Sequence, residues 1–388
     1  MTHSPFSDSE LKKLRRNFPH IVNGHIYLNH AAIAPLPLNV TGAIASFIEE
    51  RQSGPVENLE HCLEITEETR GLIADYLNSP APEQISFVGN TSEGISAIAE
   101  GVEWKPGDEI ILNDMEFPTN IQPFRMLRNK GVKTVILKSN DHRITPQQIE
   151  DAITPSTRMV SISAVQYLGG FRANLEAIGE ICSRRNLIFV VDAIQCLGFS
   201  PINVERCRID ALACGSHKWL MSPLGLGFLY TSESLASQLR PFKTGWLSVE
   251  EPWDLSNFEQ NWQTFSSHLE GGSPNMLGIV GMGASLRNLN EIGTDKIREH
   301  ILYLTQKLLK RLESEEKVTV ISPAGSDERS GILSFRIEGI NDTDRFISDM
   351  KKEKITLSSR QGLFRISPHY YNSTEDIEIA LGKMLRDD

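Results

Sequence analysis

The chain has 388 residues, an apolar content of 40% and a formal net charge of −11. Its length allows two or three domains with a large buried core, and its acidity argues against nucleic acid or an anionic membrane as partner. No apolar run approaches the roughly 20 residues of a membrane-spanning helix, and no signal peptide is expected from the first residues. Five cysteines without CxxC pairing are typical of reduced thiols in a cytoplasmic protein.

The predicted elements begin with a helix after Ser7-Asp8-Ser9-Glu10, where Ser7 or Ser9 is a candidate cap. Between about Asn90 and Lys218, short apolar strands alternate with helices, which predicts a mostly parallel, doubly wound sheet. The expected strands lie at residues 26–28, 85–88, 109–112, 134–137, 159–163, 187–191 and 211–214.

The character of the chain changes after a long helical stretch at residues 279–289. Strands expected at 318–321 and 331–335 alternate with helices in an α+β pattern. We therefore predict an N-terminal segment (1–25) packing on the small domain, a large domain (26–292) and a small C-terminal α+β domain (293–388). Residues 246–267 carry three of the five tryptophans and are predicted to form a long active-site loop.

An acid and a lysine are predicted to meet at one edge of the large sheet. Asp192 ends the apolar run 187–191, which is typical of a buried parallel strand. The strand at 211–214 leads to Lys218 at the same carboxyl edge, where open α/β sheets bind ligands. Pyridoxal phosphate forms a Schiff base with a lysine, and a carboxylate keeps its ring nitrogen protonated. The pair therefore favours this cofactor.

Two motifs around this pair resemble those of the class V aminotransferase family of fold-type I pyridoxal phosphate enzymes. Residues 191–198, VDAIQCLG, resemble the family's VDAxQxxG, and Ser216-His217-Lys218 with PLGLG at 223–227 resembles GHK…GPxGxG. The family includes cysteine desulfurases, isopenicillin N epimerase-like proteins and kynureninase-like proteins. The resemblance runs from about Tyr27 to the C-terminus and implies an α/β fold with a doubly wound sheet and a smaller α+β domain.

The resemblance implies roles around the cofactor. Lys218 would carry the Schiff base and move the substrate α-proton, Asp192 would pair with the pyridine nitrogen, and Gln195 would donate to the phenolate oxygen. Thr91 and Ser92 open a helix whose N-terminus suits a phosphate, although a plain helix cap has the same sequence. The other cofactor contacts expected are Phe117 stacked on the ring, Tyr167 near the phenolate with Gln166 competing, Ser216 and His217 at the phosphate, and Gly272 and Ser273 at the phosphate of the neighbouring subunit.

Two further motifs imply which residues contact the substrate. Arg365 begins RISPHYYN at 365–372, similar to the family's RxSxxxYNT, whose arginine clamps the substrate carboxylate. His30 and Ala32 belong to NHAA at 29–32, which matches the family's substrate-side turn, and a purely structural role for His30 stays open. No metal ligands are predicted.

Desulfurases need a nucleophilic cysteine on a mobile loop before the carboxylate arginine, and residues 355–364 contain none. We therefore predict a pyridoxal phosphate enzyme that acts on an amino acid through a Lys218 Schiff base and an α-carbanion, most like an aminotransferase. Epimerisation of the isopenicillin N epimerase type and C–S lyase chemistry stay open, as does the substrate. A cofactor-binding regulator or scaffold is disfavoured, because Lys218 and Asp192 are present and no DNA-binding domain is evident. A cytoplasmic homodimer with shared sites is expected.

Overall fold

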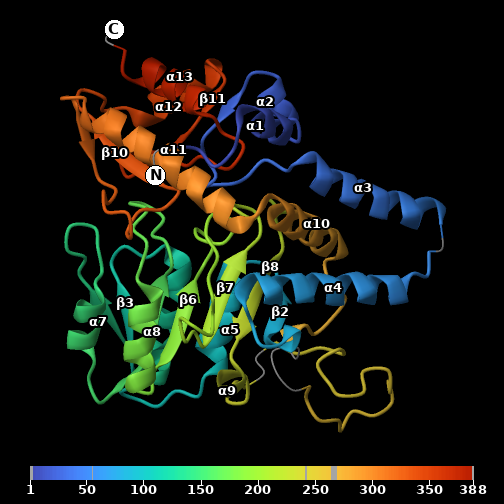
Figure 1. Cartoon of the computed structure of the whole chain (residues 1–388). Coiled ribbons are helices and arrows are strands. Elements are labelled where there is room, and N and C mark those ends of the chain that lie inside the picture. The colour runs from blue at the N-terminus through green and yellow to red at the C-terminus, as the bar shows by residue number, and fades with distance from the viewer. Residues whose placement is uncertain (1–2, 55, 241–242, 264–268, 387–388) are drawn as a thin grey trace.

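A seven-stranded sheet forms the centre of the computed structural model, which describes residues 3–54, 56–240, 243–263 and 269–386 (Figure 1). The strand order is β2-β8-β7-β6-β5-β3-β4. Neighbours from β7 to β4 pair in parallel, whereas β8 is antiparallel to both β7 and β2, so the predicted mostly parallel sheet is confirmed. The strands are β2 (Ile85–Val88), β3 (Glu109–Asn113), β4 (Lys133–Leu137), β5 (Thr157–Ser163), β6 (Ile188–Asp192), β7 (Ala211–Gly215) and β8 (Gly227–Thr231), of which β8 was not expected.

Helices cover both faces of this sheet. Successive strand residues point to opposite sides, so each strand contributes side chains to two cores. Phe189 and Val191 pack in one core with Ile178 of α8, while Val190 packs in the other with Ile95 of α5. The alternating burial explains why the strands are apolar throughout. The helices of this part are α3 (Leu38–Ser53), α4 (Leu59–Leu77), α5 (Thr91–Gly101), α6 (Gln122–Met126), α7 (Pro146–Ala152), α8 (Leu175–Arg184), α9 (Glu233–Ala236) and α10 (Met276–Ile292).

A second sheet of four antiparallel strands, in the order β12-β13-β10-β9, lies in the C-terminal part of the chain. Its own core contains Phe335, Phe364 and Leu308, which fits the α+β pattern expected there. The boundary near Gly293, between α10 and α11, stays a prediction. The elements are α11 (Thr294–Glu313), β9 (Val318–Val320), β10 (Leu333–Ile337), α12 (Thr343–Lys352), β11 (Ile355–Thr356), β12 (Ser358–Arg360), β13 (Leu363–Ile366) and α13 (Thr374–Met384).

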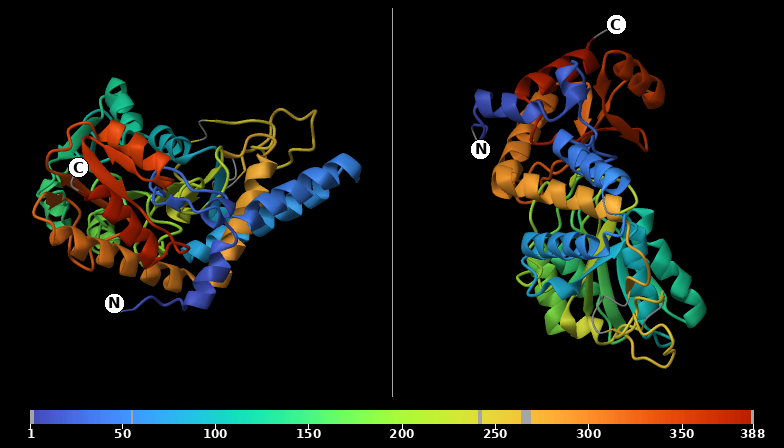
Figure 2. Two further views of the ribbon diagram at one scale, coloured as in Figure 1. Left: turned by 90° about the horizontal axis from the view of Figure 1, so that it is seen from above. Right: turned by 90° about the vertical axis from the view of Figure 1, so that its right-hand side faces the viewer.

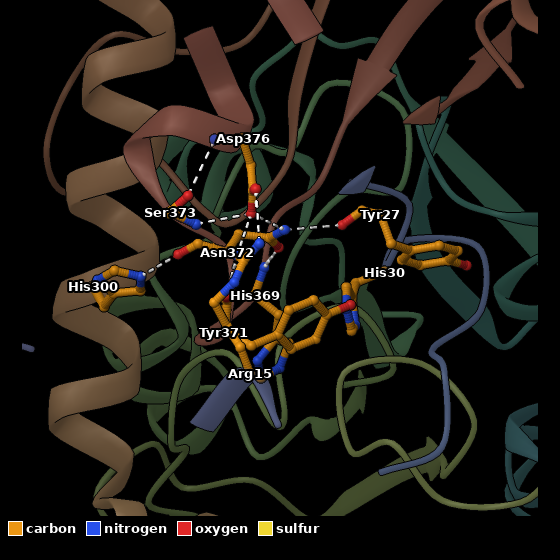
Figure 3. A network of polar contacts seen from close by, with 9 residues as sticks. All are labelled: Arg15, Tyr27, His30, His300, His369, Tyr371, Asn372, Ser373 and Asp376. Atoms are coloured by element: carbon orange, nitrogen blue, oxygen red, sulfur yellow. Dashed lines mark hydrogen bonds and ion pairs between the residues drawn. The ribbon is translucent and has the colours of Figure 1, made fainter. Parts of the chain in front are cut away.

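The N-terminal segment packs against this C-terminal part (Figures 1 and 2). Helix α1 (Asp8–Arg15) is capped by Ser7 in a capping box with Glu10, and α2 (Pro19–Val22) follows. Strand β1 (Ile26–Tyr27) pairs in parallel with β11. Figure 3 shows the joining network, in which Asn372 Nδ2 donates to the Tyr27 carbonyl and to Asp376, while Arg15 forms an ion pair with Asp376.

The segment predicted as a long loop is irregular where it is described. Residues 246–263 contain one isolated bridge, Val249 with Trp262, and residues 264–267 of the prediction lie outside the described residues. Across the described ranges, no helix combines the length and apolarity that a bilayer crossing requires.

Candidate active site

A cavity of about 360 Å³ lies at the carboxyl edge of the large sheet. It is bordered by the end of β6, the segment after β7, the N-terminus of α5, the turn after β1, and the β12–β13 hairpin. Segments far apart in the sequence therefore converge at the position that the strand-end rule predicts. The predicted residues that line the cavity are Ala32, Thr91, Ser92, Phe117, Tyr167, Asp192, Gln195, His217, Lys218 and Arg365.

Asp192 and Lys218 face this cavity without forming an ion pair with each other. Asp192 is 3% exposed, and its Oδ1 accepts from the Ile194 N–H at 3.0 Å; among described residues its second oxygen has no partner. Burial raises the pKa of Asp192 to about 6. Desolvation lowers the pKa of the Lys218 amine to about 8, so its neutral, nucleophilic form is accessible near neutral pH.

The VDAIQCLG motif at 191–198 packs directly against the segment that follows Lys218. Gly198 has φ +98°, and an added Cβ would lie 2.2 Å from the Trp219 carbonyl oxygen, so only glycine fits there. The Trp219 indole N–H donates to Gln195 Oε1 at 2.8 Å, and Gln195 Nε2 donates to the Ala31 carbonyl at 2.9 Å. One hydrogen of that amide therefore remains for a ligand in the cavity.

The N-terminus of α5 forms one end of the cavity. Asn90 caps it by accepting from the Glu93 N–H at 3.0 Å, which leaves the first N–H groups of the helix directed at the cavity. Thr91 Oγ1 accepts from the Gly215 N–H at 2.9 Å. The Ser92 hydroxyl lies 2.8 Å from that of Thr119, a cavity residue that the sequence analysis missed.

Phe117 is held at the cavity by a buried carboxylate beside it. Glu116 accepts hydrogen bonds from Asn113, Asn120, the Ser163 N–H and Gln166. Phe117 is 45% exposed, meets the Tyr167 ring edge-to-face at 5.2 Å and lies 5.7 Å from Lys218 Nζ. Of the two candidates at 166 and 167, Tyr167 lines the cavity, whereas Gln166 is directed to Glu116.

Arg365 reaches the cavity from β13 and is 2% exposed. Its Nη1 donates to the Tyr167 carbonyl at 2.7 Å, and its Nε donates to Ser358 Oγ at 3.3 Å. Three of the five guanidinium hydrogens are then left, on Nη1 and Nη2, which suffices for a bidentate carboxylate contact. Desolvation, reinforced by the nearby Arg360, lowers the Arg365 pKa to about 10.

Four predicted residues are not brought to this cavity. The Ser216 hydroxyl donates to the backbone carbonyls of Pro223 and Leu226, because the turn that follows buries it completely. His30 is fully buried with Nε2 2.7 Å from the Tyr371 hydroxyl (Figure 3), and burial holds its pKa well below the usual value. Gly272 and Ser273 line a separate cavity of about 480 Å³ together with Lys243.

The donor set fits pyridoxal phosphate. A buried carboxylate with one unbonded oxygen suits a protonated ring nitrogen, a desolvated lysine suits an aldehyde, and a helix N-terminus with hydroxyls suits a phosphate. The sheet order and the small antiparallel sheet are those of a fold-type I pyridoxal phosphate enzyme. The chain belongs to the aminotransferase class-V family, which matches residues 26–379.

The chain is similar to known proteins over nearly its whole length. The chain is 28% identical to a probable cysteine desulfurase of Methanothermobacter thermautotrophicus over 96% of this chain and 97% of the other. It is similar to the apo structure of cysteine desulfurase from Thermococcus onnurineus, with 26% identity, a TM-score of 0.88 and 96% of each chain covered. A C-DES mutant with glycine linked to its pyridoxal phosphate shares the fold, with 21% identity, a TM-score of 0.88, and 95% and 98% of the chains covered.

Proposed function

We propose that this pyridoxal phosphate enzyme acts on an α-amino acid and is an aminotransferase. The observation that carries the proposal is that Lys218, Asp192 and Arg365 line one cavity. When bound, the cofactor withdraws electrons from the bond that breaks at the substrate α-carbon. The chain's own residues would supply the binding and the proton transfer.

Each residue has a task that its surroundings support. Asp192, with its unbonded oxygen, would hold the ring nitrogen, while Thr91, Ser92 and His217 would hold the phosphate. Arg365 would orient the substrate carboxylate with its three free hydrogens. Lys218, whose pKa is lowered to about 8 by desolvation, would take and return the α-proton as a general base.

Reaction type is tested by a screen of L-amino acids against the cofactor-loaded protein. Exchange of the α-hydrogen in D₂O reports proton removal by any route, and keto acid, ammonia, sulfide and loss of optical activity separate transamination, elimination, desulfuration and epimerisation. We expect α-hydrogen exchange together with keto acid in the presence of an amino acceptor. Exchange of the α-hydrogen with the opposite enantiomer as the only product would favour an epimerase. No exchange with any amino acid would overturn the proposed function.

Turnover is expected to be independent of cysteine. All five cysteines, Cys62, Cys182, Cys196, Cys207 and Cys214, are free and buried, and none of them lines the cavity. Burial raises the pKa of Cys196 to about 12, which disfavours a nucleophilic thiolate. Converting all five to serine or alanine should leave kcat/KM within a few-fold, with circular dichroism as the folding control. A persulfide trapped on any of them during turnover with cysteine would contradict this.

We also propose a cytoplasmic location, which the free thiols support.

We further propose a homodimer. Exposed apolar side chains gather on α3, α4 and α10, which project beyond the sheet (Figures 1 and 2), and Pro274 and Leu277 border a cavity of about 640 Å³ there. Pro274 directly follows Gly272 and Ser273. The irregular loop adds Trp253, 61% exposed, and Phe258, 90% exposed. Apolar patches of this kind mark protein interfaces, so the position of Ser273 supports a contact with the partner subunit's cofactor.

Two inactive variants are expected to complement each other if sites are shared. Lys218→Ala removes the base of one site, and Ser273→Asp places a negative charge against the phosphate of the opposite site. In a mixed dimer one site collects both changes and the other collects neither, so heterodimers should recover up to about half of a wild-type dimer's activity. Mass spectrometry of the mixed dimers verifies subunit exchange. Proven exchange without recovered activity, or an active monomer in sedimentation, would count against shared sites.

A further inference from the structure

The cavity contains a second guanidinium that the proposed function leaves without a task. Arg360 lines it together with Arg365 and Lys218. Among the described residues, its side chain donates one hydrogen bond, from Nη1 to the carbonyl of the preceding Ser359, and no carboxylate there forms an ion pair with it. Asp192 is the only acidic side chain among the residues that line the cavity, and its charge acts on Lys218.

The β12–β13 hairpin fixes where Arg360 points. Gln361 and Gly362 connect the strands with φ values of +52° and +74°, as a tight two-residue hairpin turn requires. Ser358 and Arg360 share one face of β12, since side chains alternate along a strand. Ser358 Oγ accepts from Arg365 Nε, and Ser358 pairs with Arg365 across the ladder, so that face is the one that carries both arginines.

The two like charges act on each other and on the lysine. Arg360 is among the groups that lower the pKa of Arg365, after desolvation, and it also lowers that of Lys218. Arg360 is solvent-exposed, so water screens part of this repulsion, and an anion bound between the two guanidinium groups would offset the rest. In the proposed function a single substrate carboxylate would occupy the fork of Arg365 and would leave Arg360 without a counter-ion.

We propose that the substrate carries a second anionic oxyacid group on its side chain, as aspartate and glutamate do, and that Arg360 binds that group. The proposal rests on the proposed function for the position of the α-carboxylate. Arg360 is therefore a specificity-determining residue: an acidic side chain gains a charge-assisted hydrogen bond there, whereas the corresponding amide can accept only a neutral hydrogen bond and brings no counter-charge.

The test uses pairs of substrates that differ by one charge: glutamate against glutamine, and aspartate against asparagine. With the wild-type enzyme, we expect α-hydrogen exchange to be at least about 10-fold faster for the better acid than for its amide. Arg360→Gln should slow exchange of the acid roughly 10- to 100-fold and change that of the amide less than about threefold. Arg360→Lys should keep part of the preference. Arg336→Gln, an exposed arginine on β10, is the matched control and should change neither rate.

Calorimetry separates this proposal from the proposed function. Glutarate and maleate should bind the cofactor-loaded enzyme more tightly than butyrate, and Arg360→Gln should remove that difference. Cysteine sulfinate in the exchange assay distinguishes a sulfur oxyacid from a carboxylate. Equal rates for acids and amides in the wild type, or equal slowing of both by Arg360→Gln, would overturn the role of Arg360. Absent exchange with dicarboxylate binding retained would instead reject the proposed function alone.

Discussion

Replacing Lys218 with alanine is expected to abolish turnover and the borohydride-reducible linkage to the cofactor. The loss of a positioned general base alone lowers the rate by roughly 10²- to 10⁴-fold. Wild-type protein should be yellow, bleach on reduction and keep the cofactor through denaturation, whereas the variant should release it. Absorbance spectra and mass spectrometry of the reduced, denatured proteins measure this difference.

The control for this change is Lys130→Ala, which removes a surface lysine paired with Glu100. It should retain full activity and the reducible linkage. Added methylamine should restore part of the Lys218→Ala rate, because a free amine can take over the proton transfer. Normal turnover by Lys218→Ala, or a linkage that persists in it, would show that another residue holds the cofactor.

Replacing Arg365 with alanine is expected to lower kcat/KM about 30- to 1000-fold, which corresponds to roughly 2–4 kcal/mol for a lost bidentate, charge-assisted contact. The cofactor spectrum should be nearly unchanged, because the role of Arg365 is proposed on the substrate side. Steady-state kinetics and the absorbance spectrum measure the two effects separately.

Arg365→Lys distinguishes charge from geometry. Lysine keeps the positive charge but lacks the planar fork and the bonds to the Tyr167 carbonyl and Ser358. It should therefore recover only part of the loss. A variant of Arg365 that releases the cofactor while its thermal stability is unchanged would refute a role confined to the substrate.

The sequence predicts best those parts of the site that depend on local patterns. Asp192 and Lys218 stand at the ends of apolar strands, and parallel strands bring their carboxyl ends to one edge. Thr91 and Ser92 follow a capped helix start that is visible in the sequence. For these residues, the strand and helix signals also fix the direction in which each chain segment enters the cavity.

The remaining features depend on tertiary contacts. Strand β8 was not expected, since Gly227 and its neighbours were interpreted only as a motif. Whether Ser216 faces a ligand or two backbone carbonyls depends on how the turn at 223–226 folds back. Arg360 belongs to the cysteine-free segment 355–364, where Gly362 is the local signal for a turn, and the face of the strand that Arg360 shares with Ser358 depends on the pairing with residues 363–366.

The contact between the two ends of the chain has a consequence for the order of folding. Arg15 and Asp376 are separated by 361 residues. Closing a loop of that length costs roughly 5 kcal/mol of chain entropy, so their ion pair is unfavourable until folding of the intervening chain has brought the two ends together. During synthesis, β1 must wait for β11, which leaves the ribosome hundreds of residues later. The turn at 29–32, which borders the cavity, also bonds to Ser367, so this wall of the cavity can form only after the strands of the large sheet have been synthesised.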